Sequence, residues 1–144
     1  MFGKEYMNVV SIALWVGIFV GLCASTAALY GRYKVLPAFL TGPTVCELEA
    51  GGCAVLFRTK RASLLGLPNA LFGIILYLLL AAGLILHWPD AFLIIMASPG
   101  LMMSIYLGYS LISNHLQCRI CWAGHFANAT IWLALLWKLL ANWT

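Results

Sequence analysis

The chain has 144 residues, of which 64% are hydrophobic and only 8% are charged. Soluble domains carry about 25% charged residues, so this composition excludes an ordinary soluble domain and indicates a membrane protein. The net charge of +4 arises from basic residues that form no helical stripe or long run. The charge pattern therefore gives no case for nucleic-acid binding.

Four apolar stretches are long enough to cross a bilayer as helices. A spanning helix needs about 20 apolar residues, because the hydrocarbon core is about 30 Å thick. The stretches cover about residues 8–30, 64–87, 91–113 and 119–140. The first is too long for the core of a signal peptide and lacks a clean cleavage site, so we expect a retained helix. Little sequence remains outside these stretches, which predicts a single domain over residues 1–144.

The connections between the stretches predict how the helices pack. Residues 31–63 form a long polar loop in which Pro37, Pro43 and the Gly51–Gly52 pair favour turns. The other two connections are short, and short connections make neighbouring helices antiparallel. We therefore predict an all-α fold, an integral membrane four-helix bundle with a cysteine-bearing loop between its first two helices.

Four of the five cysteines fall on one side of this predicted bundle. Cys46 and Cys53 lie in the polar loop, and Cys118 and Cys121 open the fourth stretch. With four passes, the loop and the start of the fourth helix face the same side of the membrane. Cys23 lies inside the first apolar stretch, where we expect it to fill the core as a small hydrophobic residue.

The "CRIC" segment, residues 118–121, favours electron exchange over a structural cross-link. Residues three apart on a helix have Cβ atoms about 5–6 Å apart, whereas a relaxed disulfide needs about 3.5–4.5 Å. A helix N-terminus also stabilises a thiolate, and Arg119 adds positive charge beside it. A cross-link over so short a loop would constrain the unfolded chain very little.

The loop cysteines suit a pair that a partner protein can reach, because thiol–disulfide exchange requires an exposed sulfur. A structural staple within the loop stays open as an alternative for Cys46 and Cys53. A zinc site fits poorly, since six residues separate these cysteines where zinc sites have about two to four. We therefore expect no metal. Two pairs on one side predict a relay from a soluble protein to a membrane acceptor, for which a lipid-soluble quinone is the natural candidate.

The segments "CELEAGGC", "GLPNALFGIILY" and "CRIC", in this order, make the chain similar to the vitamin K epoxide reductase family. The resemblance extends to the prokaryotic disulfide-forming members and covers essentially the whole chain. It implies a four-helix bundle around a quinone pocket. Many prokaryotic members carry a fused thioredoxin-like domain that is not found here, so we expect a thioredoxin-fold partner in trans.

The resemblance also implies a role for each cysteine. Cys46 would exchange with the thiols of the partner, and Cys53 would pass electrons on by attacking Cys118. Cys121 would then reduce the quinone, which is of the ubiquinone, menaquinone or vitamin K type. Reduction of vitamin K quinone or its epoxide would use the same sulfur chemistry.

Four further residues are expected at the quinone by the same resemblance. Asn69 matches an asparagine that hydrogen-bonds a quinone carbonyl in animal members, Phe72 would wall the pocket, and Ser63 matches a small polar residue of prokaryotic members. Asn69 and Ser63 also have structural interpretations, as a polar residue at a helix start and as an N-cap of the second helix. His125 stands where animal members have a tyrosine that contacts the second carbonyl.

His125 lies one helical turn from Cys121 on the same face. A histidine can donate a hydrogen bond or a proton, and an ionisable residue inside a membrane helix is a functional candidate. The alternative is a core histidine bonded to a neighbouring helix. Another polar residue, Asn128, forms an "NAT" glycosylation sequon, but it lies inside the fourth apolar stretch, so we interpret the match as fortuitous.

Two arguments predict opposite orientations of the protein in the plasma or inner membrane, one from its charges and one from its cysteines. Lys and Arg usually mark the cytoplasmic side, and they crowd the cysteine side. That side has Arg32, Lys34, Arg58, Lys60, Arg61 and Arg119, and the other side has Lys4 and Lys138. Disulfides persist outside the cytoplasm, and together with the resemblance this favours an extracytoplasmic cysteine side, which we expect. The inverted topology stays open.

The function predicted from the sequence is therefore a membrane thiol–disulfide oxidoreductase that passes electrons to a quinone. A different class of protein stays open, a non-enzymatic four-helix membrane protein whose cysteines form structural disulfides or a metal-binding cluster.

Overall fold

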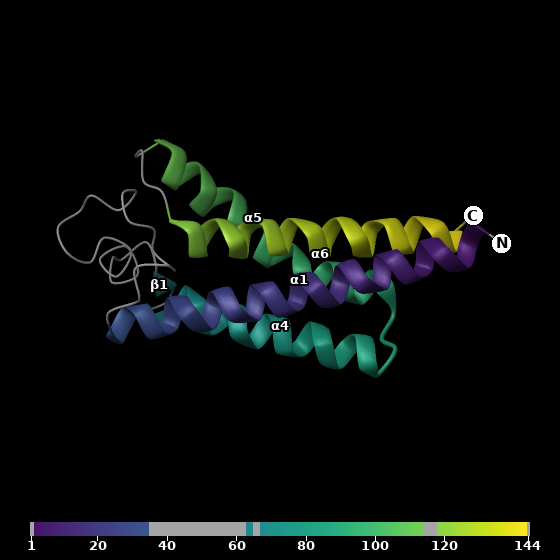
Figure 1. Ribbon diagram of the computed structural model, residues 1–144, viewed down its shortest axis with the longest axis horizontal. Coiled ribbons are helices and arrows are strands. Elements are labelled where there is room, and N and C mark those ends of the chain that lie inside the picture. The colour runs from purple at the N-terminus through teal and green to yellow at the C-terminus, as the bar shows by residue number, and fades with distance from the viewer. Residues whose placement is uncertain (1, 35–62, 65–66, 114–117, 144) are drawn as a thin grey trace.

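The computed structural model describes residues 2–34, 63–64, 67–113 and 118–143. Within these ranges the chain forms four helices and one short antiparallel hairpin (Figure 1). The elements in chain order are α1 (Phe2–Tyr33), β1 (Ser63–Leu64), β2 (Leu67–Pro68), α4 (Asn69–Ile85), α5 (Asp90–Ser113) and α6 (Arg119–Trp143). The predicted all-α bundle is confirmed.

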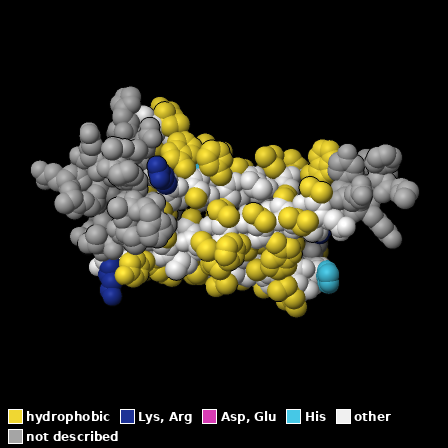
Figure 2. All heavy atoms as spheres, viewed as in Figure 1, with side chains coloured by type: hydrophobic (Ala, Val, Ile, Leu, Met, Phe, Trp, Pro, Cys, Tyr) yellow, Lys and Arg dark blue, Asp and Glu magenta, His cyan; other side chains and the backbone are white. Residues whose placement is uncertain are grey.

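The helices have the length and surface of a membrane protein. Among the described helices, α1, α5 and α6 are long and apolar enough to cross a membrane. α4 has 17 residues, at the lower limit of about 17 for a spanning helix. Large hydrophobic side chains cover the flank of the bundle (Figure 2), and Phe19, Ile95 and Met102 are exposed by 68%, 68% and 71%. So much exposed apolar surface would drive a protein to associate in water, but it is favourable against lipid.

One end of the bundle brings together helix termini that are far apart in the sequence. The C-terminus of α1 and the N-termini of α4 and α6 lie together there, while the chain ends near Phe2 and Trp143 lie at the opposite end (Figure 1). We call the end marked by Tyr33, Asn69 and Cys118 the cysteine end. Cys46 and Cys53 belong to residues 35–62, which lie outside the described residues.

The apolar pattern predicted that the second helix begins near Leu64, but it begins at Asn69. A hairpin precedes it, with Ser63 opposite Pro68 and Leu64 opposite Leu67. Pro68 occupies the N-cap position with extended backbone (φ −60°, ψ 132°) and no side-chain cap. The interpretation of Ser63 as the N-cap of this helix is therefore wrong.

The turn between α4 and α5 reverses the chain in few residues. The Trp88 N–H donates to the Gly83 carbonyl (2.9 Å) and the His87 N–H donates to the Leu84 carbonyl (3.3 Å). This pair of bonds is a Schellman motif, which needs a left-handed residue just beyond the helix. His87 supplies it with a φ of 54°. The short connection makes α4 and α5 antiparallel neighbours.

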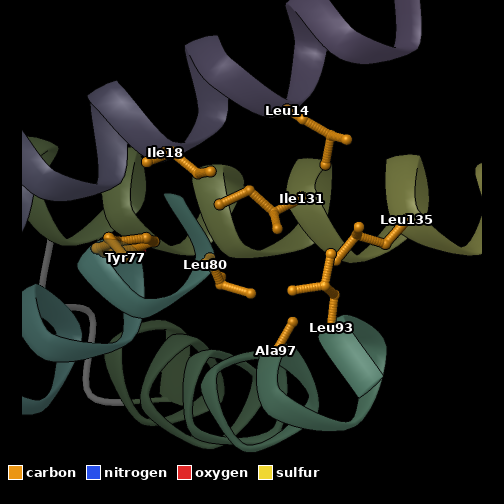
Figure 3. Close-up of a cluster of buried hydrophobic side chains, with 8 residues drawn as sticks. All are labelled: Leu14, Ile18, Tyr77, Leu80, Leu93, Ala97, Ile131 and Leu135. Carbon is orange, nitrogen blue, oxygen red and sulfur yellow. The ribbon is translucent and has the colours of Figure 1, made fainter. Parts of the chain in front are cut away.

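The central core draws on all four helices (Figure 3). α1 packs against α6 and α4, whereas α5 packs mainly on α6. The buried residues of this cluster are Leu14, Ile18, Tyr77, Leu80, Leu93, Ala97, Ile131 and Leu135. Cys23 is exposed on α1, so the expectation that it fills the core is wrong. The packed face of α1 passes through Ile18, Gly21 and Ala24, and Cys23 lies off that face.

Candidate functional site

Cys118 is the residue immediately before α6 and caps its N-terminus. The backbone N–H of Cys121 donates to the Cys118 sulfur over 3.4 Å, and the Trp122 N–H donates to the Cys118 carbonyl over 3.0 Å. An N-cap side chain normally offers an oxygen to the amide three residues on. Here the sulfur takes that position, where the amide and the helix dipole both favour negative charge.

The Cys118 side chain is buried against α1. It is 1% exposed and forms a small cluster with Ala24 and Ile120, bordered by further alanines of α1. Small residues let helices approach closely, and a Cβ added to Gly124 of α6 would lie 3.8 Å from the Ala24 Cβ. Close packing of α1 on α6 therefore encloses this sulfur within the protein.

Cys121 differs from Cys118 in its surroundings. It is partly buried at the border of the same cluster and is a free thiol, so no disulfide joins it to Cys118 in this structure. The helical turn from residue 118 to residue 121 thus holds one enclosed and one more accessible sulfur. This arrangement fits a pair in which only one member faces a membrane-soluble acceptor.

His125 follows Cys121 by one turn and lies between α6 and α5. Its ring meets Trp122 edge-on, with centroids 6.0 Å apart and planes at 86°. A Cβ added to Gly108 of α5 would lie 3.8 Å from its Cδ2. The Nε2 atom is buried and has no hydrogen-bond partner among the described residues. Such a nitrogen suits a ligand carbonyl, because a buried polar atom otherwise loses the hydrogen bond that water would give.

The other predicted quinone contacts surround the start of α4. Asn69 is the first residue of that helix, and its Oδ1 is buried. Phe72, one turn further, is 37% exposed. Ser63 lies in β1, whose pairing with β2 leads the chain directly into Asn69. The structure thus places Asn69, Cys118 and the start of α6 at the cysteine end.

A polar cluster in the interior was not predicted as part of a site. The Tyr77 hydroxyl donates to Asn128 Oδ1 (2.7 Å), and Asn128 Nδ2 donates to Ser104 Oγ (2.7 Å) and to the Gly100 carbonyl (3.2 Å). The sequence drew attention to Asn128 only as part of a sequon. The usable signal was an amide in an apolar membrane helix, which requires partners from neighbouring helices.

An apolar helical bundle with a Cys-x-x-Cys at the start of one helix has the architecture of a membrane thiol–disulfide oxidoreductase. The model of the vitamin K epoxide reductase family matches residues 12–136. The chain belongs to this family, and membership makes it a membrane oxidoreductase that acts on thiols and disulfides. No curated protein and no solved structure matches the chain.

Proposed function

We propose that the protein oxidises a dithiol of a thioredoxin-fold partner and reduces a membrane quinone. Each turnover would convert one partner dithiol and one quinone into one partner disulfide and one quinol, so two electrons and two protons change hands. The observation that carries the proposal is the start of α6. There the Cys118 sulfur caps the helix through the Cys121 amide, and a buried His125 nitrogen lies one turn further on.

The electrons would pass along the cysteines in one direction. A partner thiolate attacks Cys46 of a Cys46–Cys53 disulfide and releases the Cys53 thiolate. The second thiolate of the partner then attacks the mixed disulfide, so the partner leaves as a disulfide and Cys46 is released as a thiolate. Cys53 attacks Cys118 in a Cys118–Cys121 disulfide, and the leaving group is the Cys121 thiolate. The Cys46 thiolate then attacks Cys53, which restores the loop disulfide and releases Cys118 as a thiolate. Strain in a disulfide at a helix start makes that bond easy to open. As Cys118 and Cys121 form their disulfide again, they release the two electrons that the quinone accepts, with Cys121 as the sulfur that faces it.

His125 and Asn69 would hold the acceptor. The buried Nε2 of His125 offers a carbonyl a hydrogen bond close to Cys121, and Asn69 approaches from the start of α4 at the same end of the bundle. His125 would also supply a proton as the quinone becomes a quinol. Phe72 and Ser63 complete the proposed contacts.

Purified protein in detergent tests the function directly. With a reduced thioredoxin-fold donor, it should reduce a short-chain quinone, observed as loss of the quinone absorbance. Cys121→Ala should abolish quinone reduction while the helical signal of the bundle remains. The matched control is Cys23→Ala, which removes an exposed thiol that lies off the packed face of α1. Full turnover by Cys121→Ala, or a stoichiometric bound zinc in the wild type, would contradict the proposal.

We further propose that the cysteine end faces the extracytoplasmic side, where disulfides persist. The charge distribution favours the reverse: Arg119 is exposed at the cysteine end, whereas Lys138 at the opposite end pairs with Asp90 over 2.7 Å. The clearest Lys and Arg side chains in Figure 2 likewise lie at the cysteine end. The orientation therefore needs an experiment of its own.

Labelling of intact cells decides the orientation. After mild reduction, a membrane-impermeant maleimide should modify Cys46 and Cys53 in a Cys23→Ala background. The control is a variant whose sole cysteine is introduced by Asn142→Cys, at the opposite end of the bundle. The maleimide should not modify that cysteine until the cells are opened. The reverse pattern would place the cysteine end in the cytoplasm and make cytosolic dithiols the substrates.

A further inference from the structure

Asn128 joins three helices through an amide that makes three hydrogen bonds. Its Oδ1 accepts from Tyr77 of α4, and its Nδ2 donates to Ser104 and to the Gly100 carbonyl of α5. Ser104 is 7% exposed and Tyr77 is 2% exposed, so the bonds lie inside the protein. We call Tyr77, Ser104 and Asn128 the polar hub.

The hub is held at fixed geometry by its surroundings. The Tyr77 ring fills a notch in α1 that only glycine leaves open, since a Cβ at Gly21 would lie 2.2 Å from its Cζ. Gly100 follows Pro99, whose missing N–H weakens the ladder of α5 at that turn. A Cβ at Gly100 would lie 2.6 Å from Leu76 Cδ2, so α5 approaches α4 closely here. The hub therefore has little freedom to move.

The hub also lies on the face of α6 that carries the redox site. Cys121, His125 and Asn128 are spaced by four and then three residues, which places them on one helical face. Asn128 is about 10 Å along the helix axis from Cys121, at about 1.5 Å per residue. The rotation of α6 that satisfies Asn128 is thus the rotation that turns His125 toward Gly108 of α5.

We propose that Asn128 is a positioning residue for quinone reduction, acting through the hub to fix the rotation of α6 and with it the positions of His125 and Cys121. This inference rests on the proposed function. Asn128 touches neither reacting sulfur. It sets the rotation of α6, and the geometry of a reacting pair is sensitive to small displacements, a misplacement of about 1 Å costing on the order of 10²-fold in rate.

A neighbouring contact provides a matched control. Trp132 Nε1 donates to Ser98 Oγ over 3.2 Å, which also joins α6 to α5, one turn beyond Asn128. Ser98→Ala removes a side-chain bond between the same two helices but leaves the hub intact. A loss caused by general loosening of the bundle should be similar in Ser98→Ala and in hub variants.

The experiment separates the two half-reactions. Tyr77→Phe keeps the ring in its notch and removes only the hydroxyl, so it changes the packing of the bundle less than Asn128→Ala does. We expect kcat/KM for the quinone to fall at least tenfold in Tyr77→Phe, and up to the order of 10²-fold in Asn128→Ala. Single-turnover oxidation of the donor without quinone should stay at the wild-type rate, and Ser98→Ala should match the wild type in both assays.

A second readout does not depend on the quinone. The rate at which N-ethylmaleimide alkylates Cys121 should change in Tyr77→Phe and Asn128→Ala and stay unchanged in Ser98→Ala. If the wild type reduces no quinone but these rates change as expected, the proposed function fails, whereas the control of Cys121 by the hub stands. The positioning role of Asn128 would be overturned if the hub variants kept the wild-type alkylation rate and kcat/KM. It would also be overturned if Ser98→Ala lost as much activity as the hub variants.

Discussion

Cys118 combines two tasks that are usually given to different residues. Its sulfur caps α6 by accepting the Cys121 N–H, and the same sulfur is the expected point of attack in the relay. A cap normally stabilises a helix by about 1 kcal/mol. Any step that draws the sulfur into a new bond must therefore compete with its role at the helix start.

The two tasks can be separated by substitution. Cys118→Ser keeps an acceptor for the Cys121 amide, whereas Cys118→Ala removes it, so we expect only the alanine variant to lose about 0.5–2 kcal/mol of stability. Both variants should lose donor-driven quinone reduction. Thermal unfolding in detergent measures the first difference. Equal unfolding temperatures for the two variants would show that the sulfur contributes nothing as a cap.

His125 allows a second prediction at this scale. His125→Phe keeps an aromatic ring beside Trp122 but removes Nε2, so quinone reduction should fall by on the order of 10²-fold, as expected for the loss of a proton donor. His125→Tyr restores a hydroxyl of the kind that animal members carry and should recover part of the rate. Steady-state kinetics with a soluble quinone checks both, and full activity of His125→Phe would remove this residue from the site.

Single residues show where sequence reasoning succeeded and where it stopped. Cys118 at the start of α6 was predictable, because a polar connection gives way there to an apolar stretch. The outward position of Cys23 was not, since an all-apolar helix carries no stripe that separates lipid from core. Asn128 was missed for a related reason. Its partners come from α4 and α5, and only the three-dimensional structure brings them together.

At the scale of elements, glycines set how closely the helices approach. Gly21→Ala would bring a Cβ to 2.2 Å from the Tyr77 ring and force α1 away from α4. Overpacking of this kind costs about 1–3 kcal/mol. Gly124→Ala is the matched control, because its nearest neighbour would be 3.8 Å away. We expect thermal unfolding to show a clear loss for the first variant and none for the second.

The start of α4 could not be predicted from hydropathy alone. Leu64 and Leu67 are as apolar as the helix that follows, yet they pair across a hairpin. Pro68 then holds extended backbone, and the helix begins only at Asn69. Hydrophobicity reports burial or lipid contact and cannot by itself separate a strand from a helix over so few residues.

At the scale of the whole molecule, an ion pair fastens the end opposite the cysteines. Asp90, the first residue of α5, accepts from Lys138 (2.7 Å) and from Asn142 (2.9 Å) near the end of α6. Asp90→Ala removes both bonds and a carboxylate at a helix N-terminus, whereas Lys138→Met removes one bond. We expect the first to cost about 1 kcal/mol and the second less, since the pair is partly exposed.

Salt provides the check on this prediction. Thermal unfolding at low and high ionic strength should show the Asp90→Ala loss shrinking as salt screens the pair. Redox activity should be unaffected in both variants, because the pair lies at the end of the bundle away from Cys118 (Figure 1). A loss that does not change with salt would assign the contribution of Asp90 to hydrogen bonding alone.

Under the proposed relay, the enclosure of Cys118 against α1 would restrict which thiols can pass electrons to the protein. With 1% of its surface exposed, this sulfur is closed to glutathione and to passing protein thiols. Under the proposed relay, a sulfur of the same chain would be its only donor, so electrons from the general thiol pool could not enter through Cys118. The close alanine contacts of α1 would thus prevent cellular thiols from reducing Cys118 directly. The choice of electron donor would then depend on the partner-facing cysteines.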